Sequence, residues 1–149
     1  MKKNGISMII FVISIAMILT LVTTFTASYN VIIESSRKRE FASELNSVQK
    51  AVDQYKFMNN EYPVVSDYIL SLNLTNREDT ANEKQFYVID FSKLDIDELQ
   101  RGTSGDTSSL DIYGIDKDEG KVYYLAGVQI NKDWYYTLDD NLRKLLNDW

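Results

Sequence analysis

The first residues of the chain are followed by an apolar run without a charged side chain, which extends over 22 residues from Ile6 to Ala27. A secretory signal peptide has an apolar core of about 7 to 15 residues, whereas a helix needs about 20 to cross the hydrocarbon of a bilayer. The best candidate cleavage site, at the far edge of the run around Ala27, is a poor one. We therefore predict a retained transmembrane helix over residues 6–27.

The charges that flank the run predict its orientation. Lys2, Lys3 and the initiator amine precede it with no acidic residue between them, and positive charge of this kind stays on the cytoplasmic side. The basic residues 37–39 beyond the run are interleaved with Glu34 and Glu40 and belong to a long downstream region that is translocated regardless of charge. We expect a single-pass protein of the cell membrane, with a cytoplasmic N-terminus and an extracytoplasmic C-terminal domain.

The part of the chain after the run has the composition of one globular domain. The chain has 149 residues and no cysteine, so this domain must be held by packing rather than by disulfides. Its formal charge is −8, because all 22 acidic residues but only 14 of the 16 basic ones follow the run. Such a charge repels a phosphate backbone, and we expect no nucleic-acid partner.

The helix is predicted to continue beyond the apolar run. Residues 29–58 contain neither glycine nor proline, and five apolar residues recur at intervals of four, three, four and three, namely Phe41, Leu45, Val48, Val52 and Tyr55. This spacing places them on one face of a helix, which we expect to pack against the rest of the domain. Asn59, Asn60 and Pro63 indicate where the helix ends.

Shorter elements are predicted after Pro63. Ser66 to Leu72 has the pattern of a brief capped helix, and residues 101–109 that of a loop. The strand candidates are residues 85–91, 110–115, 121–130 and 134–138, and a short helix is expected to start near Asp139 or Asp140. The predicted fold class is α+β, with a long N-terminal helix, transmembrane in its inner half and amphipathic in its outer half, packed on a small antiparallel sheet of about four strands.

This arrangement resembles a type IV pilin or a type II secretion pseudopilin. The resemblance is carried by the short basic leader Met1 to Gly5, by the apolar run "ISMIIFVISIAMILTL" that follows it, and by "AVDQYKFMNNEYP" at the helix exit. The segment "DIYGIDKDEGKVYYLAGVQINKDWYYTL" is similar, more loosely, to the C-terminal strands of pilin-like proteins. The implied division is a leader at 1–5, a transmembrane half-helix at 6–27, an amphipathic half-helix at 28–58 and a β-rich head at 59–149.

The resemblance implies how such a chain is processed and assembled. A prepilin peptidase would cut after Gly5, and Ile6 would become the N-methylated mature N-terminus. The partners implied are the membrane, this peptidase and other pilin-like subunits, which would contact the N-terminal helix around Ile6, Ile10 and Phe11. The alternative for the Gly5–Ile6 junction is an uncut signal anchor in which the glycine is incidental.

One position departs from the pattern of the family. Most pilins carry a glutamate at the fifth mature position, which is Ile10 in this chain. In the family this carboxylate is thought to pair with the N-terminal ammonium of a neighbouring subunit, which Ile10 cannot do. The departure argues against a standard major subunit and favours a minor one.

Two clusters of residues allow more than one interpretation. Asp116, Asp118 and Glu119 provide oxygen ligands at close spacing, which would suit calcium, yet the same segment is a good hairpin turn, and the turn is the favoured interpretation. Tyr123, Tyr124, Trp134, Tyr135 and Tyr136 suggest either an aromatic ligand surface or, as the favoured interpretation, a sheet with one core face and one half-exposed face.

Enzymatic activity is not expected. The chain has no histidine and no cysteine, so the usual bases, thiol nucleophiles and imidazole ligands are absent. Asp95 and Asp97 would share one face of an extended segment, with no pocket evident. No cofactor is predicted. Two functions are considered: a structural subunit, minor in role, of a type IV pilus-like or type II pseudopilus-like envelope filament, and a monomeric signal-anchored domain that binds a ligand or partner.

Overall fold

The computed structural model describes residues 3–72, 74, 84–96, 99–103 and 108–147, without the side chains of residues 3–7, 21–28, 30, 66–69, 72 and 147. Its elements follow one another as helix α1 (Lys3–Asn59), strand β1 (Val64–Leu72), strand β2 (Lys84–Ile89), a 3-10 turn η1 (Phe91–Lys93), strands β3 (Tyr113–Asp116), β4 (Val122–Ile130) and β5 (Asp133–Thr137), and helix α2 (Asp140–Asn147).

The strands form one antiparallel sheet in which spatial order equals chain order, β1-β2-β3-β4-β5. Each strand pairs with the next along the chain, with Tyr87 opposite Ile115 and Gly114 opposite Tyr123. The register of the β4–β5 pair shifts between Tyr123 and Val128, where the sheet contains a bulge. The connection between β4 and β5 is a short turn, in which Asn131 adopts a left-handed conformation.

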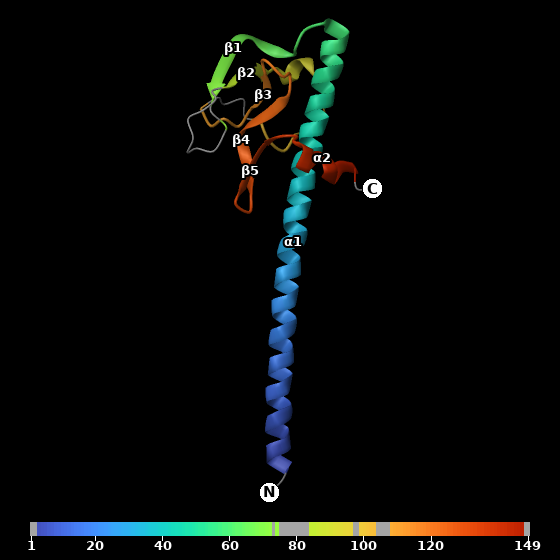
Figure 1. The fold of residues 1–149 in the computed structure, drawn as a ribbon, viewed down its shortest axis with the longest axis vertical. Coiled ribbons are helices and arrows are strands. Elements are labelled where there is room, and N and C mark those ends of the chain that lie inside the picture. Colours follow the sequence, from blue (N-terminus) through green and yellow to red (C-terminus); the bar gives the residue numbers. More distant parts are fainter. Residues whose placement is uncertain (1–2, 73, 75–83, 97–98, 104–107, 148–149) are drawn as a thin grey trace. The chain divides into compact units, whose positions relative to one another are not determined.

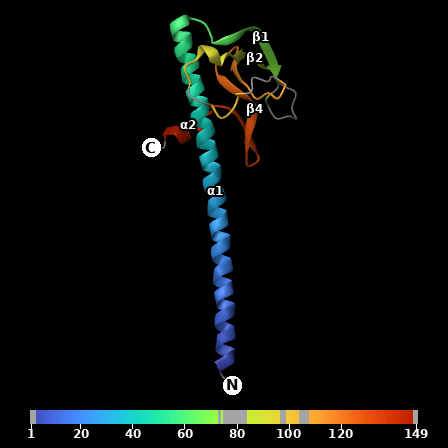
Figure 2. The same cartoon turned by 180° about the vertical axis from the view of Figure 1, so that it is seen from behind.

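The chain divides into two compact units, residues 1–36 and residues 37–149. The first unit, here called the N-terminal unit, holds the beginning of α1. The second, here called the head, holds the end of α1, the sheet and α2 (Figures 1 and 2).

The head has a hydrophobic layer on each face of its sheet. One layer joins the end of α1 to the sheet and to Leu142 of α2, with Tyr113, Ile115 and Tyr124 buried from the sheet side. The other layer lies on the opposite face and includes Phe86, Val88, Ile112, Tyr123 and Leu125. The two layers follow from alternation, because successive side chains of a strand point to opposite faces.

The prediction of a transmembrane helix is wrong for the part of the chain that the structure describes. No helix there combines the length and the apolar character that a bilayer crossing requires. Within α1, residues 31–59 carry many charged side chains, which are costly in the hydrocarbon of a bilayer. The same finding overturns the predicted single-pass localisation and the transmembrane half of the predicted fold class.

The segment Ser66 to Leu72 is also corrected. It belongs to strand β1 rather than to a short helix, and Leu70 and Ser71 pair with Phe86 and Gln85 of β2. The serine that suggested a helix cap is a local signal, whereas pairing with β2 supplies main-chain hydrogen bonds along the segment. With β1 included, the sheet has five strands rather than about four.

Candidate functional site

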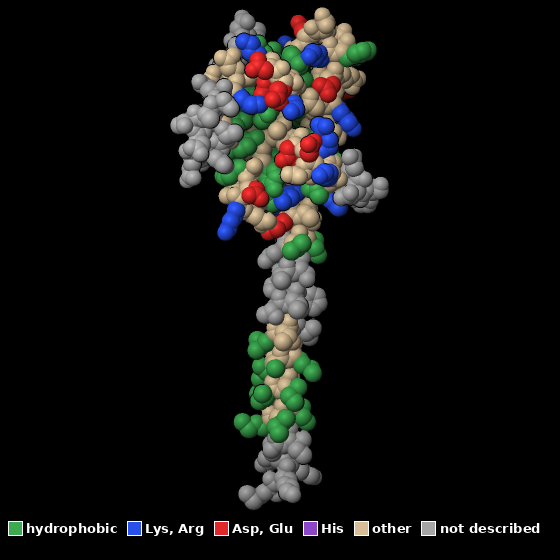
Figure 3. All heavy atoms as spheres, viewed as in Figure 1, with side chains coloured by type: hydrophobic (Ala, Val, Ile, Leu, Met, Phe, Trp, Pro, Cys, Tyr) green, Lys and Arg blue, Asp and Glu red, His purple; other side chains and the backbone are tan. Residues whose placement is uncertain are grey.

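The N-terminal unit presents an unusual amount of apolar surface. Ten large apolar side chains between Met8 and Leu19 are 42 to 71% exposed, among them the predicted assembly residues Ile10 and Phe11. Figure 3 shows these hydrophobic side chains around the helix. Gly5 and Ile6 lie within α1, but their side chains are outside the described part of the structure, so the predicted cleavage remains a prediction.

The apolar surface surrounds the helix rather than forming a stripe. Residues 8–13 are six consecutive exposed apolar residues, and a helix completes a turn every 3.6 residues, so they cover its whole circumference. The hydroxyls of Ser14 and Thr20 donate hydrogen bonds to the carbonyls of Ile10 and Met17. These polar side chains are therefore satisfied by their own helix and require no outside partner.

The stripe predicted on the later part of α1 faces the sheet. Phe41, Leu45, Val48 and Val52 are almost fully buried in the layer between α1 and the sheet. Tyr55 is only half-buried, and its hydroxyl donates a hydrogen bond to Glu61 near the helix exit. Four of the five predicted packing residues thus lie together in the buried layer, and Tyr55 is only partly buried.

Two polar residues at the borders of this stripe were not predicted. The Glu44 carboxylate accepts hydrogen bonds from the backbone N–H groups of Gln100 and Arg101 and pairs with the Arg101 guanidinium. Gln49 accepts the Val122 N–H at 2.8 Å and donates to the Gly120 carbonyl at 3.3 Å. Their position three or four residues from the buried apolar residues was the signal that could have identified them.

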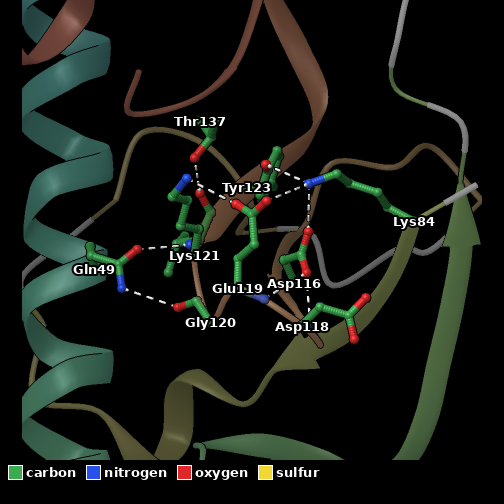
Figure 4. Close-up of polar contacts among 10 residues, drawn as sticks. Gln49, Lys84, Asp116, Asp118, Glu119, Gly120, Lys121, Tyr123 and Thr137 are labelled. Atoms are coloured by element: carbon green, nitrogen blue, oxygen red, sulfur yellow. Dashed lines mark hydrogen bonds and ion pairs between the residues drawn. The ribbon is translucent and has the colours of Figure 1, made fainter. Parts of the chain in front are cut away.

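The candidate calcium ligands form a different arrangement, shown in Figure 4. Asp116 is buried, its Oδ1 accepts the N–H groups of Asp118 and Glu119, and its Oδ2 accepts the Lys84 ammonium at 2.8 Å. Lys84 is also 3.5 Å from Glu119. The ammonium therefore occupies the position between the carboxylates that a cation would need. Among the described residues, no group of three or more potential ligands could hold a metal.

The pKa shifts of Asp116 and Lys84 agree with an ion pair between the end of β3 and the start of β2. Burial opposes the charge of Asp116, but the Lys84 hydrogen bond and the two backbone N–H groups outweigh it and lower the pKa of the carboxyl. The hydrogen bond to Asp116 raises the pKa of Lys84, and burial lowers it by a smaller amount.

The Tyr113 hydroxyl lies elsewhere, in the layer between α1 and the sheet. Burial, followed by the nearby Glu44 carboxylate, raises its pKa.

The aromatic residues near the C-terminus divide between the two faces of the sheet. Tyr124 and Tyr135 belong to the layer next to α1, where Tyr124 packs edge-on against Phe41 at 6.1 Å. Tyr123 and Tyr136 belong to the opposite layer, and Trp134 stacks on Tyr136. The five residues therefore do not form one surface, although Tyr123, Trp134, Tyr135 and Tyr136 all line one cavity.

Asp95 lies on the segment that follows η1. It lines a groove of about 550 Å³ together with residues of α1 that include Glu40 and Lys50. Asp97 lies outside the described residues, so the structure does not place the carboxylate pair considered from the sequence.

The chain was compared with protein families, with curated proteins and with solved structures. No protein-family model, no curated protein and no solved structure matches the chain.

Proposed function

We propose that this chain is a structural subunit, minor in role, of a pilus-like or pseudopilus-like filament, and that it assembles through the N-terminal unit of α1. The observation that carries the proposal is the apolar surface around residues 8–19. Exposed apolar patches of this size mark interaction sites. Removing them from water is the main favourable contribution to association.

The geometry of the surface favours several copies over a single partner. A single neighbouring helix covers one stripe of the helix that it packs against, whereas the exposed residues 8–13 surround α1 completely. Full coverage therefore needs neighbours on several sides, as in the interior of a helical bundle. Equivalent helices of further copies provide the same apolar side chains, and none of the described residues 8–20 brings a charge into such a bundle.

Ile10 supports a minor rather than a major role. Its side chain is exposed and apolar, so it provides packing area but no carboxylate for the terminal ammonium of a neighbour. The alternative function, a monomeric domain with a signal anchor, leaves the apolar side chains of the N-terminal unit uncovered.

The proposal is tested with a matched pair of aspartate substitutions in the full-length chain. Ile13 is 49% exposed on the N-terminal unit and Phe57 is 90% exposed on the head. Ile13→Asp should abolish assembly into sedimenting or shearable filaments, because a carboxylate would be desolvated in the bundle. Phe57→Asp introduces the same charge on the head and should leave assembly unchanged.

The result that would contradict the proposal is equal sedimentation of all three chains as monomers. Processing is measured separately, by mass spectrometry of the N-terminus with and without a co-expressed prepilin peptidase. We expect a chain that begins at methylated Ile6 only when the peptidase is present.

A further inference from the structure

The head carries a groove of about 550 Å³ between α1 and the segment that follows η1. Ser43, Ser47 and Ala51 of α1 line it, and they share one face of the helix because they are spaced by four residues. Ile96 and Leu99 of the segment after η1 form an apolar wall. Because the side chains on the α1 side are small, another element can approach the helix closely here.

The segment after η1 is fixed at both of its ends. At one end, the Asp90 N–H donates to the Pro63 carbonyl at 2.9 Å, which connects η1 to the exit of α1. At the other end, the N–H groups of Gln100 and Arg101 donate to the Glu44 carboxylate. The groove is therefore present before a partner binds, and its formation costs no binding energy.

The groove carries a small negative charge. Three carboxylates line it, namely Glu40, Glu44 and Asp95, against the cation of Lys50. Arg101 pairs with Glu44 and lies 3.7 Å from Glu40, so the net charge of the five residues is −1. Asp95 is exposed, and among the described residues no ion pair involves it. The groove thus favours an apolar partner that brings a cation.

The helix α1 carries such a surface just before the head. Tyr29, Val31, Ile32 and Ile33, here called the collar, are 37 to 65% exposed. The collar spans more than one helical turn, so it is exposed on several sides of the helix. Arg37 follows Ile33 by about one turn, is exposed, and forms no ion pair with a described residue.

In the filament proposed above, on which this inference rests, copies related by rotation and translation along one axis point in the same direction. Packed helices lie about 8 to 10 Å apart, whereas the five strands of one head span about 19 Å at about 4.8 Å per strand pair. Because neighbours surround each α1, their heads cannot all lie at one level. The copies must be displaced along the axis, which brings the collar of one copy beside the head of another.

We propose that the groove of one copy holds the collar of a neighbouring copy. The large collar side chains fill the space above Ser43, Ser47 and Ala51, and apolar surface of both copies is removed from water. Arg37 of the neighbour then lies within reach of Asp95 and offsets the charge of the groove. Two different surfaces meet in this contact, and such a contact extends into a filament when it does not close into a ring.

Disulfide cross-linking tests the contact, since the chain has no cysteine. Full-length Ile32→Cys and Ser47→Cys chains are mixed, assembly is measured by sedimentation, and the sedimented material is oxidised. We expect a covalent dimer with one chain of each kind, in at least tenfold higher yield than from either chain alone. The control mixes Ile32→Cys with Gln129→Cys, which should give no such dimer because Gln129 is exposed on β4 outside the groove.

A charge exchange tests the ion pair between the copies. Asp95→Arg in the Ser47→Cys chain places a cation opposite Arg37 and should lower the yield of the dimer at least fivefold. Arg37→Asp in the Ile32→Cys chain should restore the yield. Both residues are exposed, so the variants should remain folded, as circular dichroism melts measure.

The possible results separate this contact from the assembly itself. Chains that sediment as filaments but give no dimer, or give it equally with the control pair, would overturn the contact and leave the proposed function intact. A yield that Asp95→Arg does not change would also overturn the contact. Chains that stay monomeric in sedimentation would overturn both proposals.

Discussion

At the scale of single residues, the Glu44 carboxylate connects α1 to the backbone and side chain of the segment at Gln100 and Arg101. Its side chain is 9% exposed and receives two backbone N–H groups as well as the Arg101 guanidinium. Removing a buried charge partner leaves several donors desolvated. We expect Glu44→Ala to lower the free energy of unfolding by about 2 to 4 kcal/mol, as measured by urea denaturation.

Glu40 offers the matched control. It lies 3.7 Å from the same guanidinium, but its side chain is 45% exposed. Because exposed ion pairs contribute little, Glu40→Ala should cost less than about 1 kcal/mol. Equal losses for the two variants would show that Glu44 acts only as one member of a surface charge network.

Asp116 gives the head a defined response to acid. Its pKa is lowered from the ordinary value of 3.8, so the charged form is favoured in the folded state. The stabilisation is then complete above pH 3.8 and is lost as the pH falls through the lower folded pKa. The difference in unfolding free energy between the unchanged chain and Asp116→Asn should therefore be constant near neutral pH and shrink below about pH 4.

The control for this experiment is Asp118→Asn, because Asp118 is exposed and contributes its backbone N–H rather than its carboxylate. Thermal melts between pH 2.5 and pH 7 measure both variants. A difference for Asp116→Asn that stays constant down to pH 2.5 would show that its charge does not carry the stabilisation.

At the scale of elements, Gln49 connects α1 to the β3–β4 hairpin by side-chain hydrogen bonds, in addition to the apolar packing between them. Gln49 accepts the Val122 N–H at the start of β4 and donates to Gly120 in the turn. Gln49→Leu keeps the volume but leaves both backbone groups without this partner. We expect a loss of about 1 to 3 kcal/mol, together with faster amide exchange of Val122.

Gln54 is the corresponding control on the same helix, since it is exposed. Gln54→Leu should change stability by less than about 0.5 kcal/mol and leave the Val122 amide as it is. Slow exchange of Val122 in Gln49→Leu would mean that the hairpin is held by its strand pairing alone.

At the scale of the whole molecule, the two units differ in how far their apolar side chains are buried. Every residue of the two buried layers lies in the head, whereas the N-terminal unit is dominated by exposed apolar side chains. A chain that begins at Arg37 should therefore fold cooperatively and remain monomeric, while the full-length chain self-associates. Sedimentation velocity and thermal unfolding of the two chains measure this. Self-association of the shortened chain would place the assembly surface on the head instead.

The features of the fold that could be predicted from the sequence are those that depend on residues near one another in the chain. The spacing of Phe41, Leu45, Val48 and Val52 predicts a buried helical face. The branched and aromatic residues of 121–130 and 134–138, separated by a connection of hairpin length, predict strands. Both patterns depend on backbone geometry that neighbouring residues share. The end of α1 was predictable for the same reason, since Asn60 adopts the left-handed conformation that follows a helix.

The tertiary structure decided which distant groups meet. Ser66 to Leu72 is a strand because its main chain pairs with β2. Asp116 pairs with Lys84, which is 32 positions away in the chain. The Tyr136 ring likewise lies against Gly127 of the neighbouring strand. Such contacts are set by pairing register and by packing between elements, which no local pattern encodes.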